Sequence, residues 1–272
     1  VINTDGQTYR YLINNANFES YVKVIKKDAE TGKTIPYAGA GFKIYDPDGK
    51  LVTMTYTYPT PTTIDTFYTD ANGSLITPER LPYGKGYTLI EVQAPYGYVI
   101  DRNPVSFDIT ADTAKEDGGI TVVVIEVENK PIRGSVKVTK VDEDNPETKL
   151  SGAVFEVYVD VDKNKEFTPE IDILIGKLKE DEVGVYIMND LRYNGYFIHE
   201  KSAPDGYIKD KDYHYFEITE DGMLIELKIT NEKTPEPEVP VPDIPNTDAS
   251  WKLSFWVGIS AVALGGLIAY VI

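Results

Sequence analysis

Two glutamates interrupt apolar, aromatic-rich stretches of this sequence at corresponding places. Glu91 ends the run YTLIE and Glu200 ends the run YFIHE, and each begins the motif E-x-x-A-P-x-G-Y. The runs are typical of β-strands, and Ala-Pro-x-Gly-Tyr is typical of a turn, because Pro restricts φ and Gly tolerates positive φ. A carboxylate within an apolar strand needs a partner, since an unpaired buried charge is costly.

Lysines and asparagines at corresponding places in the two halves are the candidate partners. Each half has a lysine in its first predicted strand and an asparagine in its last predicted strand. The first and last strands of a sandwich can lie side by side, so we expect these residues to meet the glutamate in the core. The two candidate sets are Lys23, Glu91 and Asn129, and Lys137, Glu200 and Asn231.

Composition limits the function classes. A formal charge of −17 and a pI near 4.5 argue against binding nucleic acid or an anionic membrane surface. The 272 residues include no Cys and only two His, His199 and His214, so thiolate chemistry and a histidine-rich metal centre are excluded. We assign both histidines to strands. Twenty Tyr, 17 Pro and 21 Gly favour an all-β chain with many turns.

The order of segments predicts two tandem β-sandwich domains, at 18–131 and 132–234. YVKVIKKD in the first is echoed by SVKVTKVD in the second, and AGAGFKIY by SGAVFEVY. Short strands separated by frequent turn signals are typical of sandwiches. We expect the weakly patterned segment 53–66 to form edge strands or an exposed loop. Residues 1–17 are expected to be the last strand of a preceding domain, with a flexible leader as the alternative.

The segments VKVTKVD, SGAVFEVY, EKSAPDGY and ITN resemble the Cna B-type (SpaA-like) domains of Gram-positive surface proteins and pilins. The resemblance covers residues 18–234 in two copies, and its most specific element is E-x-x-A-P-x-G-Y. It implies transthyretin-like, inverse immunoglobulin-like sandwiches. It also implies autocatalytic lysine–asparagine isopeptide bonds, Lys23–Asn129 helped by Glu91 and Lys137–Asn231 helped by Glu200.

The chemistry of such a bond has a physical basis. An amine attacks a carboxamide only in its neutral form, and burial lowers the pKa of a lysine by disfavouring the charged form. A nearby carboxyl can polarise the asparagine carbonyl and transfer protons. Fixed geometry in a dry core replaces a slow bimolecular reaction. The alternative for each set is a buried salt bridge, or a solvated lysine, with no bond formed.

The choice of lysine is open. Val136, Val138 and Lys140 share one face of an alternating strand, and Lys137 lies on the other. If the valines point inward, Lys140, and by analogy Lys26, is the buried amine. The spacing to Asp142 is similar to that of family members that use the Lys137 position, so we favour Lys23 and Lys137.

An acidic segment has the start of a calcium loop. Asp160, Asp162 and Asn164 follow the D-x-D-x-N pattern whose alternate side chains can converge on a hard cation. Lys165 replaces the expected sixth-position glycine and Ile171 the twelfth-position glutamate, although Glu170 and Asp172 lie nearby. We favour a solvated acidic loop, and we predict no metal and no cofactor.

The C-terminal part changes character. We interpret 235–243 as an extended Pro-rich wall spacer and 244–272 as a sorting signal with a transmembrane helix. The order resembles a sortase signal of the LPxTG type, with the motif at Ile244, Pro245, Asn246, Thr247 and Asp248. Ile244 and Asp248 depart from that pattern and no basic tail follows Ile272. The alternative is a permanent membrane anchor.

These features together predict a structural protein of the cell surface. We expect a wall-anchored stalk or pilin-type subunit, with sortase and either peptidoglycan or other pilin subunits as partners. The alternative is the stalk region of an adhesin whose other part binds a host ligand. The sequence has no convergent set of nucleophile, base and metal ligands, so we do not expect an enzyme that acts on an external substrate.

Overall fold

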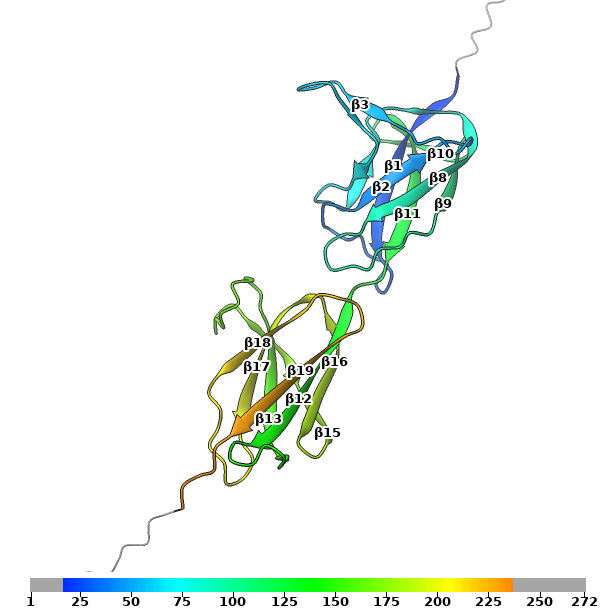
Figure 1. Cartoon of the computed structure of the whole chain (residues 1–272). Coiled ribbons are helices and arrows are strands. Elements are labelled where there is room, and N and C mark those ends of the chain that lie inside the picture. Colours follow the sequence, from blue (N-terminus) through cyan, green and yellow to red (C-terminus); the bar gives the residue numbers. More distant parts are fainter. Residues whose placement is uncertain (1–16, 237–272) are drawn as a thin grey trace, which may run out of the picture. The chain divides into compact units, whose positions relative to one another are not determined.

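The computed structural model describes residues 17–236, and within this range every regular element is a β-strand (Figure 1). Strands between residues 19 and 129 form one pair of sheets, and strands between 133 and 231 form another. The all-β prediction is therefore confirmed. Residues 1–16 and 237–272 lie outside the described residues. They include nearly all of the predicted N-terminal strand 1–17, most of the predicted spacer 235–243, and the whole predicted sorting signal 244–272 with Ile244–Asp248.

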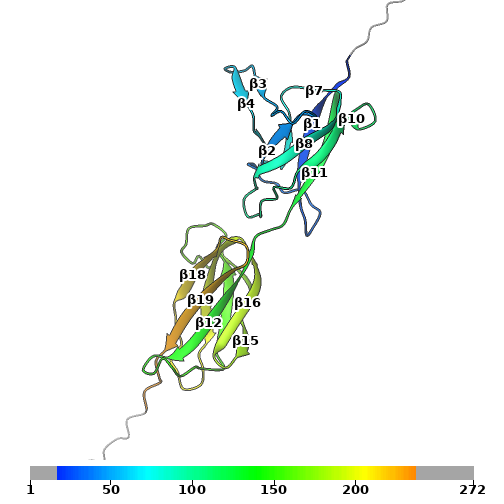
Figure 2. The ribbon, with the colours of Figure 1, turned by 45° about the vertical axis from the view of Figure 1, so that its right-hand side comes forward.

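The first sandwich pairs a sheet of order β10-β11-β1-β6, with β7 also on β1, against a sheet of order β5-β2-β8-β9. A short hairpin of β3 and β4 is separate from both sheets and occupies the weakly patterned segment (Figure 2). The strands are β1 (Glu19–Asp28), β2 (Gly41–Tyr45), β3 (Met54–Tyr56), β4 (Thr62–Ile64), β5 (Phe67–Tyr68), β6 (Ser74–Ile76), β7 (Leu81–Pro82), β8 (Gly84–Gln93), β9 (Val105–Ile109), β10 (Ala114–Asp117) and β11 (Ile120–Asn129).

The second sandwich repeats this plan with fewer strands. Its sheets have the orders β15-β16-β12-β19 and β14-β13-β17-β18. The strands are β12 (Arg133–Asp142), β13 (Val154–Val159), β14 (Ile173–Lys177), β15 (Lys179–Glu182), β16 (Val185–Arg192), β17 (Asn194–Ser202), β18 (Tyr213–Ile218) and β19 (Met223–Asn231).

The first and last strands of each sandwich are neighbours and run parallel. β1 pairs with β11 and β12 pairs with β19, and both pairs lie side by side in Figures 1 and 2. The register places Asp28 opposite Asn129 and Asp142 opposite Asn231. Residues about 100 positions apart in the sequence therefore meet at the same end of each parallel pair.

Alternation along these strands decides which side chains enter the core. Val22, Val24, Lys26 and Asp28 of β1 are buried, and the residues between them are partly exposed. Successive side chains of a strand point to opposite faces, so the basic Lys26 and the acidic Asp28 share the core-facing side of β1 with the two valines. Beside them the core is apolar and includes Phe42, Ile44 and Leu89 in the first sandwich, and Phe155, Val157 and Ile198 in the second.

No helix within residues 17–236 is both long enough and apolar enough to cross a bilayer. The predicted strand positions of His199 and His214 agree with the structure, which places them in β17 and β18.

Candidate functional site

A lysine, a glutamate and an asparagine meet in the core of the first sandwich. The Glu91 carboxylate lies between the other two: Oε1 is 3.1 Å from Lys26 Nζ, and Oε2 accepts a hydrogen bond of 2.7 Å from Asn129 Nδ2. Lys26, Glu91 and Asn129 are at most 2% exposed. They come from β1, β8 and β11, so the cluster joins both sheets.

The second sandwich contains the same cluster. Glu200 Oε1 is 3.1 Å from Lys140 Nζ, and Glu200 Oε2 accepts a hydrogen bond of 2.9 Å from Asn231 Nδ2. Lys140 also donates a hydrogen bond to the carbonyl of Thr230, at 2.9 Å. The three side chains are at most 3% exposed. The two sandwiches therefore contain the same Lys–Glu–Asn cluster, although their sequences agree more in the order of their motifs than in residue identity.

The structure corrects the preferred lysines. Lys23 and Lys137 point out of the sheets, where they pair with the exposed carboxylates of Asp117 and Glu226. Each of these two lysines lies an odd number of residues from the buried lysine of its strand, and therefore on the opposite face. The inward-facing valines identify Lys26 and Lys140 as the buried amines, which was the alternative interpretation.

A β-bulge follows each glutamate. Phe42 lies opposite Glu91, but its neighbour Gly41 lies opposite Gln93, so Val92 is the extra residue. The second sandwich has the same irregularity: Phe155 lies opposite Glu200, and Val154 lies opposite Ser202. Bulges bend a strand and redirect side chains. Here the bulge occupies the first x position of E-x-x-A-P-x-G-Y in both copies.

An aromatic ring lines each lysine. The Lys26 ammonium lies 5.7 Å from the centre of the Phe42 ring, and Lys140 lies 5.7 Å from the Phe155 ring. Both rings are fully buried. The phenylalanines exclude water from the amine while offering the face of an aromatic ring to a cation.

The turn after the glutamate returns the chain over the asparagine. Tyr98 N–H donates to the carbonyl of Pro95, and Gly97 has φ of 79°, which glycine adopts without strain. The next residues supply two contacts: the Val99 carbonyl accepts a hydrogen bond of 2.5 Å from Asn129 Nδ2, and Asp101 N–H donates one of 2.8 Å to Glu91 Oε2.

The second copy makes the equivalent contacts. Tyr207 N–H donates to the carbonyl of Pro204, and Gly206 has φ of 81°. Asn231 Nδ2 donates to the Ile208 carbonyl, and Asp210 N–H donates to Glu200 Oε2 at 2.7 Å. The carbonyl that accepts from Nδ2 determines which atom of the asparagine amide faces the glutamate. The motif therefore positions the glutamate and the asparagine together.

Sequence reasoning missed a second contact of the motif. The hydroxyl of Tyr98 donates to Asp28 at 2.8 Å, and that of Tyr207 donates to Asp142 at 2.9 Å. Burial opposes ionisation of Asp28, but hydrogen bonds from Tyr98 and from the backbone N–H groups of Thr31 and Glu30 lower its pKa to about 2. In the sequence, this contact is indicated only by an Asp that follows the buried lysine by two residues in both copies.

Burial shifts the ionisation of both core lysines. Desolvation lowers the pKa of Lys26 and of Lys140, while the adjacent glutamate acts in the opposite direction. A lowered pKa increases the fraction of neutral amine, which is the nucleophilic form.

Several buried polar atoms lack hydrogen-bond partners. Six side-chain atoms in the described part of the chain do so, and five belong to the two clusters. The Lys26–Glu91 contact has the distance of an ion pair without hydrogen-bond geometry, so both atoms belong to this set. Buried groups of this kind are rare in native proteins and call for an explanation. The five atoms are Lys26 Nζ, Glu91 Oε1, Asn129 Oδ1, Glu200 Oε1 and Asn231 Oδ1.

Two prealbumin-like sandwiches, each with a buried Lys–Glu–Asn cluster, define the class of this protein. The chain belongs to the SpaA family of prealbumin-like fold domains, whose profile matches residues 20–123 and 134–233. Comparison with curated protein sequences gave no match.

Solved structures of several bacterial proteins are similar. The TIE protein of Bacillus anthracis is 31% identical, with a TM-score of 0.61 over 80% of this chain and 35% of that one. This chain therefore spans about a third of the length of that protein. A streptococcal ancillary pilin is 25% identical, with a TM-score of 0.32 over 86% of this chain and 69% of that one. A variant of BcpA, the major pilin subunit of Bacillus cereus, is 18% identical, with a TM-score of 0.31 over 79% of this chain and 100% of that one.

Proposed function

We propose that each sandwich cross-links itself through an amide bond, Lys26 to Asn129 and Lys140 to Asn231. The observation that carries this proposal is the position of the glutamate, whose two oxygens contact the amine and the amide nitrogen. Such a carboxylate can take a proton from the attacking nitrogen and give one to the leaving nitrogen. Glu91 and Glu200 are the catalytic groups of a reaction that each domain performs once on itself.

The reaction has two steps. The lone pair of neutral Lys26 Nζ attacks Cγ of Asn129, the C=O electrons move to Oδ1, and a proton of Nζ passes to Glu91. Glu91 then protonates Nδ2, the Cγ–Nδ2 bond breaks, and ammonia leaves as the carbonyl forms again. The products are one amide and one ammonia, and the glutamate returns to its starting state. Fixed geometry in a dry core accelerates the attack, because it replaces a bimolecular encounter with an arrangement in which the reacting groups are already in contact.

A surface pocket beside Asn231 supports release of the leaving group from the second sandwich. Asn231 lines a surface pocket together with Ile208, Asp210 and His214. Asn231 is only 3% exposed, so the asparagine is shielded while one side of it lies close to solvent.

The position of the bond suits a load-bearing function. The chain enters each sandwich through its first strand and leaves through its last, and these strands are parallel neighbours. Tension applied to the two ends therefore passes along β1 to Lys26, across the bond, and out through Asn129. The residues between them, which include the other strands of the sandwich, carry none of this load.

We infer that the chain is a stalk or pilin-type subunit at the surface of a Gram-positive cell. Tandem SpaA-type domains and the similarity to the TIE protein support this inference. The sequence 244–248, which resembles a sortase signal, supports wall anchoring with sortase and either peptidoglycan or other subunits as partners. The self-directed chemistry argues for a structural function instead of catalysis on an external substrate.

Intact mass spectrometry of the full chain tests the cross-links. We expect a mass lower than that of the sequence by two ammonia molecules. A mass equal to that of the sequence would show that the clusters are buried ion pairs without bonds.

A further inference from the structure

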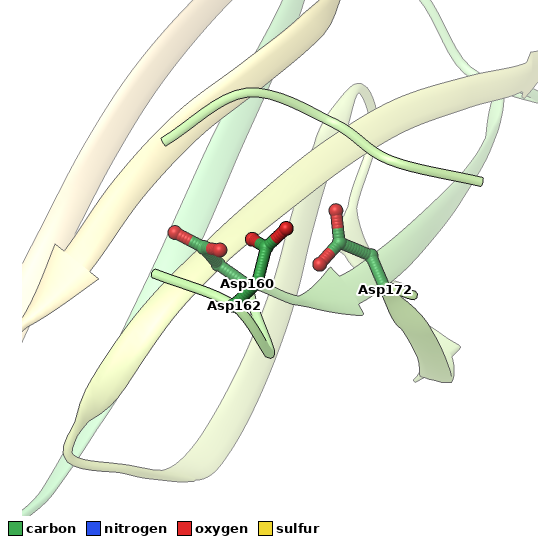
Figure 3. A group of neighbouring side chains, drawn as sticks. All are labelled: Asp160, Asp162 and Asp172. Atoms are coloured by element: carbon green, nitrogen blue, oxygen red, sulfur yellow. The ribbon is translucent and has the colours of Figure 1, made fainter. Parts of the chain in front are cut away.

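The loop between β13 and β14 gathers three carboxylates that the cross-linking chemistry does not use. Asp160, Asp162 and Asp172 each place a carboxylate oxygen so that all three lie within 4.8 Å of one another. Figure 3 shows the three carboxylates next to one another, although Asp172 is twelve residues from Asp160 in the sequence. Asp160 and Asp172 are buried, and Asp162 is exposed.

Asp160 supplies a second and independent observation. Its side chain is 1% exposed, and its Oδ1 is the sixth buried side-chain atom without a hydrogen-bond partner in the described part of the chain. Its other oxygen accepts only a long hydrogen bond of 3.2 Å from Lys165 N–H. A buried carboxylate oxygen without a donor is costly, so a cation at this position would satisfy an atom that the protein does not.

Backbone contacts hold two of the three carboxylates in place. Asp172 accepts hydrogen bonds from Val161 N–H at 3.0 Å and Thr168 N–H at 2.7 Å, which join the two ends of the loop. Asp162 accepts one from Asn164 N–H at 3.3 Å. Such contacts reduce the ordering that ion binding would otherwise require.

Neither lysine of the loop, Lys163 or Lys165, forms an ion pair with the three carboxylates within the described residues. Lys165 Nζ pairs with Glu217 at 2.8 Å. Lys165 itself has φ of 64°, the conformation for which a calcium loop ordinarily uses glycine at its sixth position. The replacement of that glycine, which counted against a calcium loop in the sequence, is therefore accommodated by the backbone.

We propose that Asp160, Asp162 and Asp172 form a calcium site in the second sandwich. Calcium binds oxygen ligands at about 2.3–2.6 Å, so two ligands of one ion can be as much as about 5 Å apart, whereas magnesium requires a tighter set. Backbone carbonyls of the loop and water would complete the six to eight ligands that calcium prefers. Asn164, the third residue of the sequence motif, donates its amide nitrogen to Asp162 and so presents no oxygen there. Asp172 takes its place.

The site can be tested by titration calorimetry, in which calcium is added to the full chain after bound metal ions have been removed with a chelator. We expect one calcium ion per chain and at least tenfold weaker binding of magnesium. Asp162→Asn changes an exposed side chain and should leave the fold intact while weakening calcium binding at least tenfold. Asp172→Asn should also weaken calcium binding, but both oxygens of Asp172 accept backbone hydrogen bonds, so this variant also loosens the loop and Asp162→Asn is the deciding variant. The exposed Asp181→Asn serves as the matched control without effect.

Each outcome is decisive. Calcium should also raise the thermal midpoint of the wild-type chain, because a ligand that binds only the folded state stabilises it, and it should not raise that of Asp162→Asn. Absence of calcium binding by the wild-type chain, equal affinity for magnesium, or equal affinity of Asp162→Asn and Asp181→Asn would each overturn the assignment. Circular dichroism of the variants separates loss of the site from loss of the fold. The test is independent of the ammonia loss that reports the cross-links.

Discussion

Asn129 lies opposite Asp28 in the parallel pair β1–β11, and this pairing places it two residues beyond the position opposite Lys26 on the same core-facing side. The second sandwich has the same offset between Lys140 and Asn231. Side chains two residues apart on a strand point to the same face of the sheet. The parallel pairing of first and last strands is therefore the feature that brings amine and amide together.

The first prediction concerns the glutamates. Glu91→Gln removes the group that moves protons between amine and amide, so the full chain should retain one more ammonia than the wild type in intact mass spectrometry. Glu200→Gln should have the same effect on the second sandwich. Glu128→Gln, an exposed neighbour in the same domain, is the control. Loss of two ammonia molecules by Glu91→Gln would contradict the assigned function of Glu91.

The second prediction concerns stability. Asn231→Ala removes the electrophile, so the second sandwich unfolds without a covalent link between its first and last strands. A cross-link that closes a loop of roughly 90–100 residues stabilises by about 4–5 kcal/mol in the chain-entropy estimate for disulfides. We expect a large fall in the thermal midpoint measured by calorimetry. The exposed Asn189→Ala should change it little, and equal midpoints for the two variants would argue against a bond at Asn231.

The third prediction concerns the tyrosine of the motif. Tyr98→Phe deletes the hydrogen bond to the buried Asp28 carboxylate and should lower the free energy of unfolding of the first sandwich by about 1–3 kcal/mol. Chemical denaturation measures this change. Tyr83→Phe removes a hydroxyl from an exposed side chain and should be neutral. If both variants have the stability of the wild type, the Tyr98–Asp28 contact contributes nothing.

The fourth prediction is a pH dependence of the second sandwich. A hydrogen bond from Lys233, together with those from Tyr207 and backbone N–H groups, lowers the pKa of Asp142 to about 2, despite its burial. This folded-state pKa lies below the unfolded value of about 3.9, so the stabilisation is present above that pH and is lost as pH falls toward about 2. Thermal midpoints at decreasing pH should fall through this window. The fall should be smaller in Asp142→Asn, and identical profiles would refute the assignment.

Much of the fold and part of the site follow from the sequence. Alternating apolar residues and frequent turns predict sandwiches, and the repeat itself indicates Glu91, Glu200, Asn129 and Asn231 as corresponding residues. The inward valines of SVKVTKVD also point to Lys140. The preference for Lys137 came from spacing in similar domains, and the alternation of the strand was the better guide.

Other features depend on contacts that no local pattern reveals. The bulge at Val92 becomes visible only when β2 and β8 are paired, because it is a mismatch between two strands. The contact of Tyr98 with Asp28 requires the turn to fold back across the parallel pair. Asp172 joins Asp160 only because hydrogen bonds close the loop between them. Each of these three features depends on contacts between segments that are distant in the sequence, so a local sequence pattern does not predict it.

Peptide mapping by tandem mass spectrometry of the digested full chain tests the central claim most directly. We predict two branched peptides, one joining Lys26 to Asn129 and one joining Lys140 to Asn231, each lacking one ammonia. Branched peptides through Lys23 or Lys137, or only linear peptides that contain unmodified Lys26 and Asn129, would contradict the account.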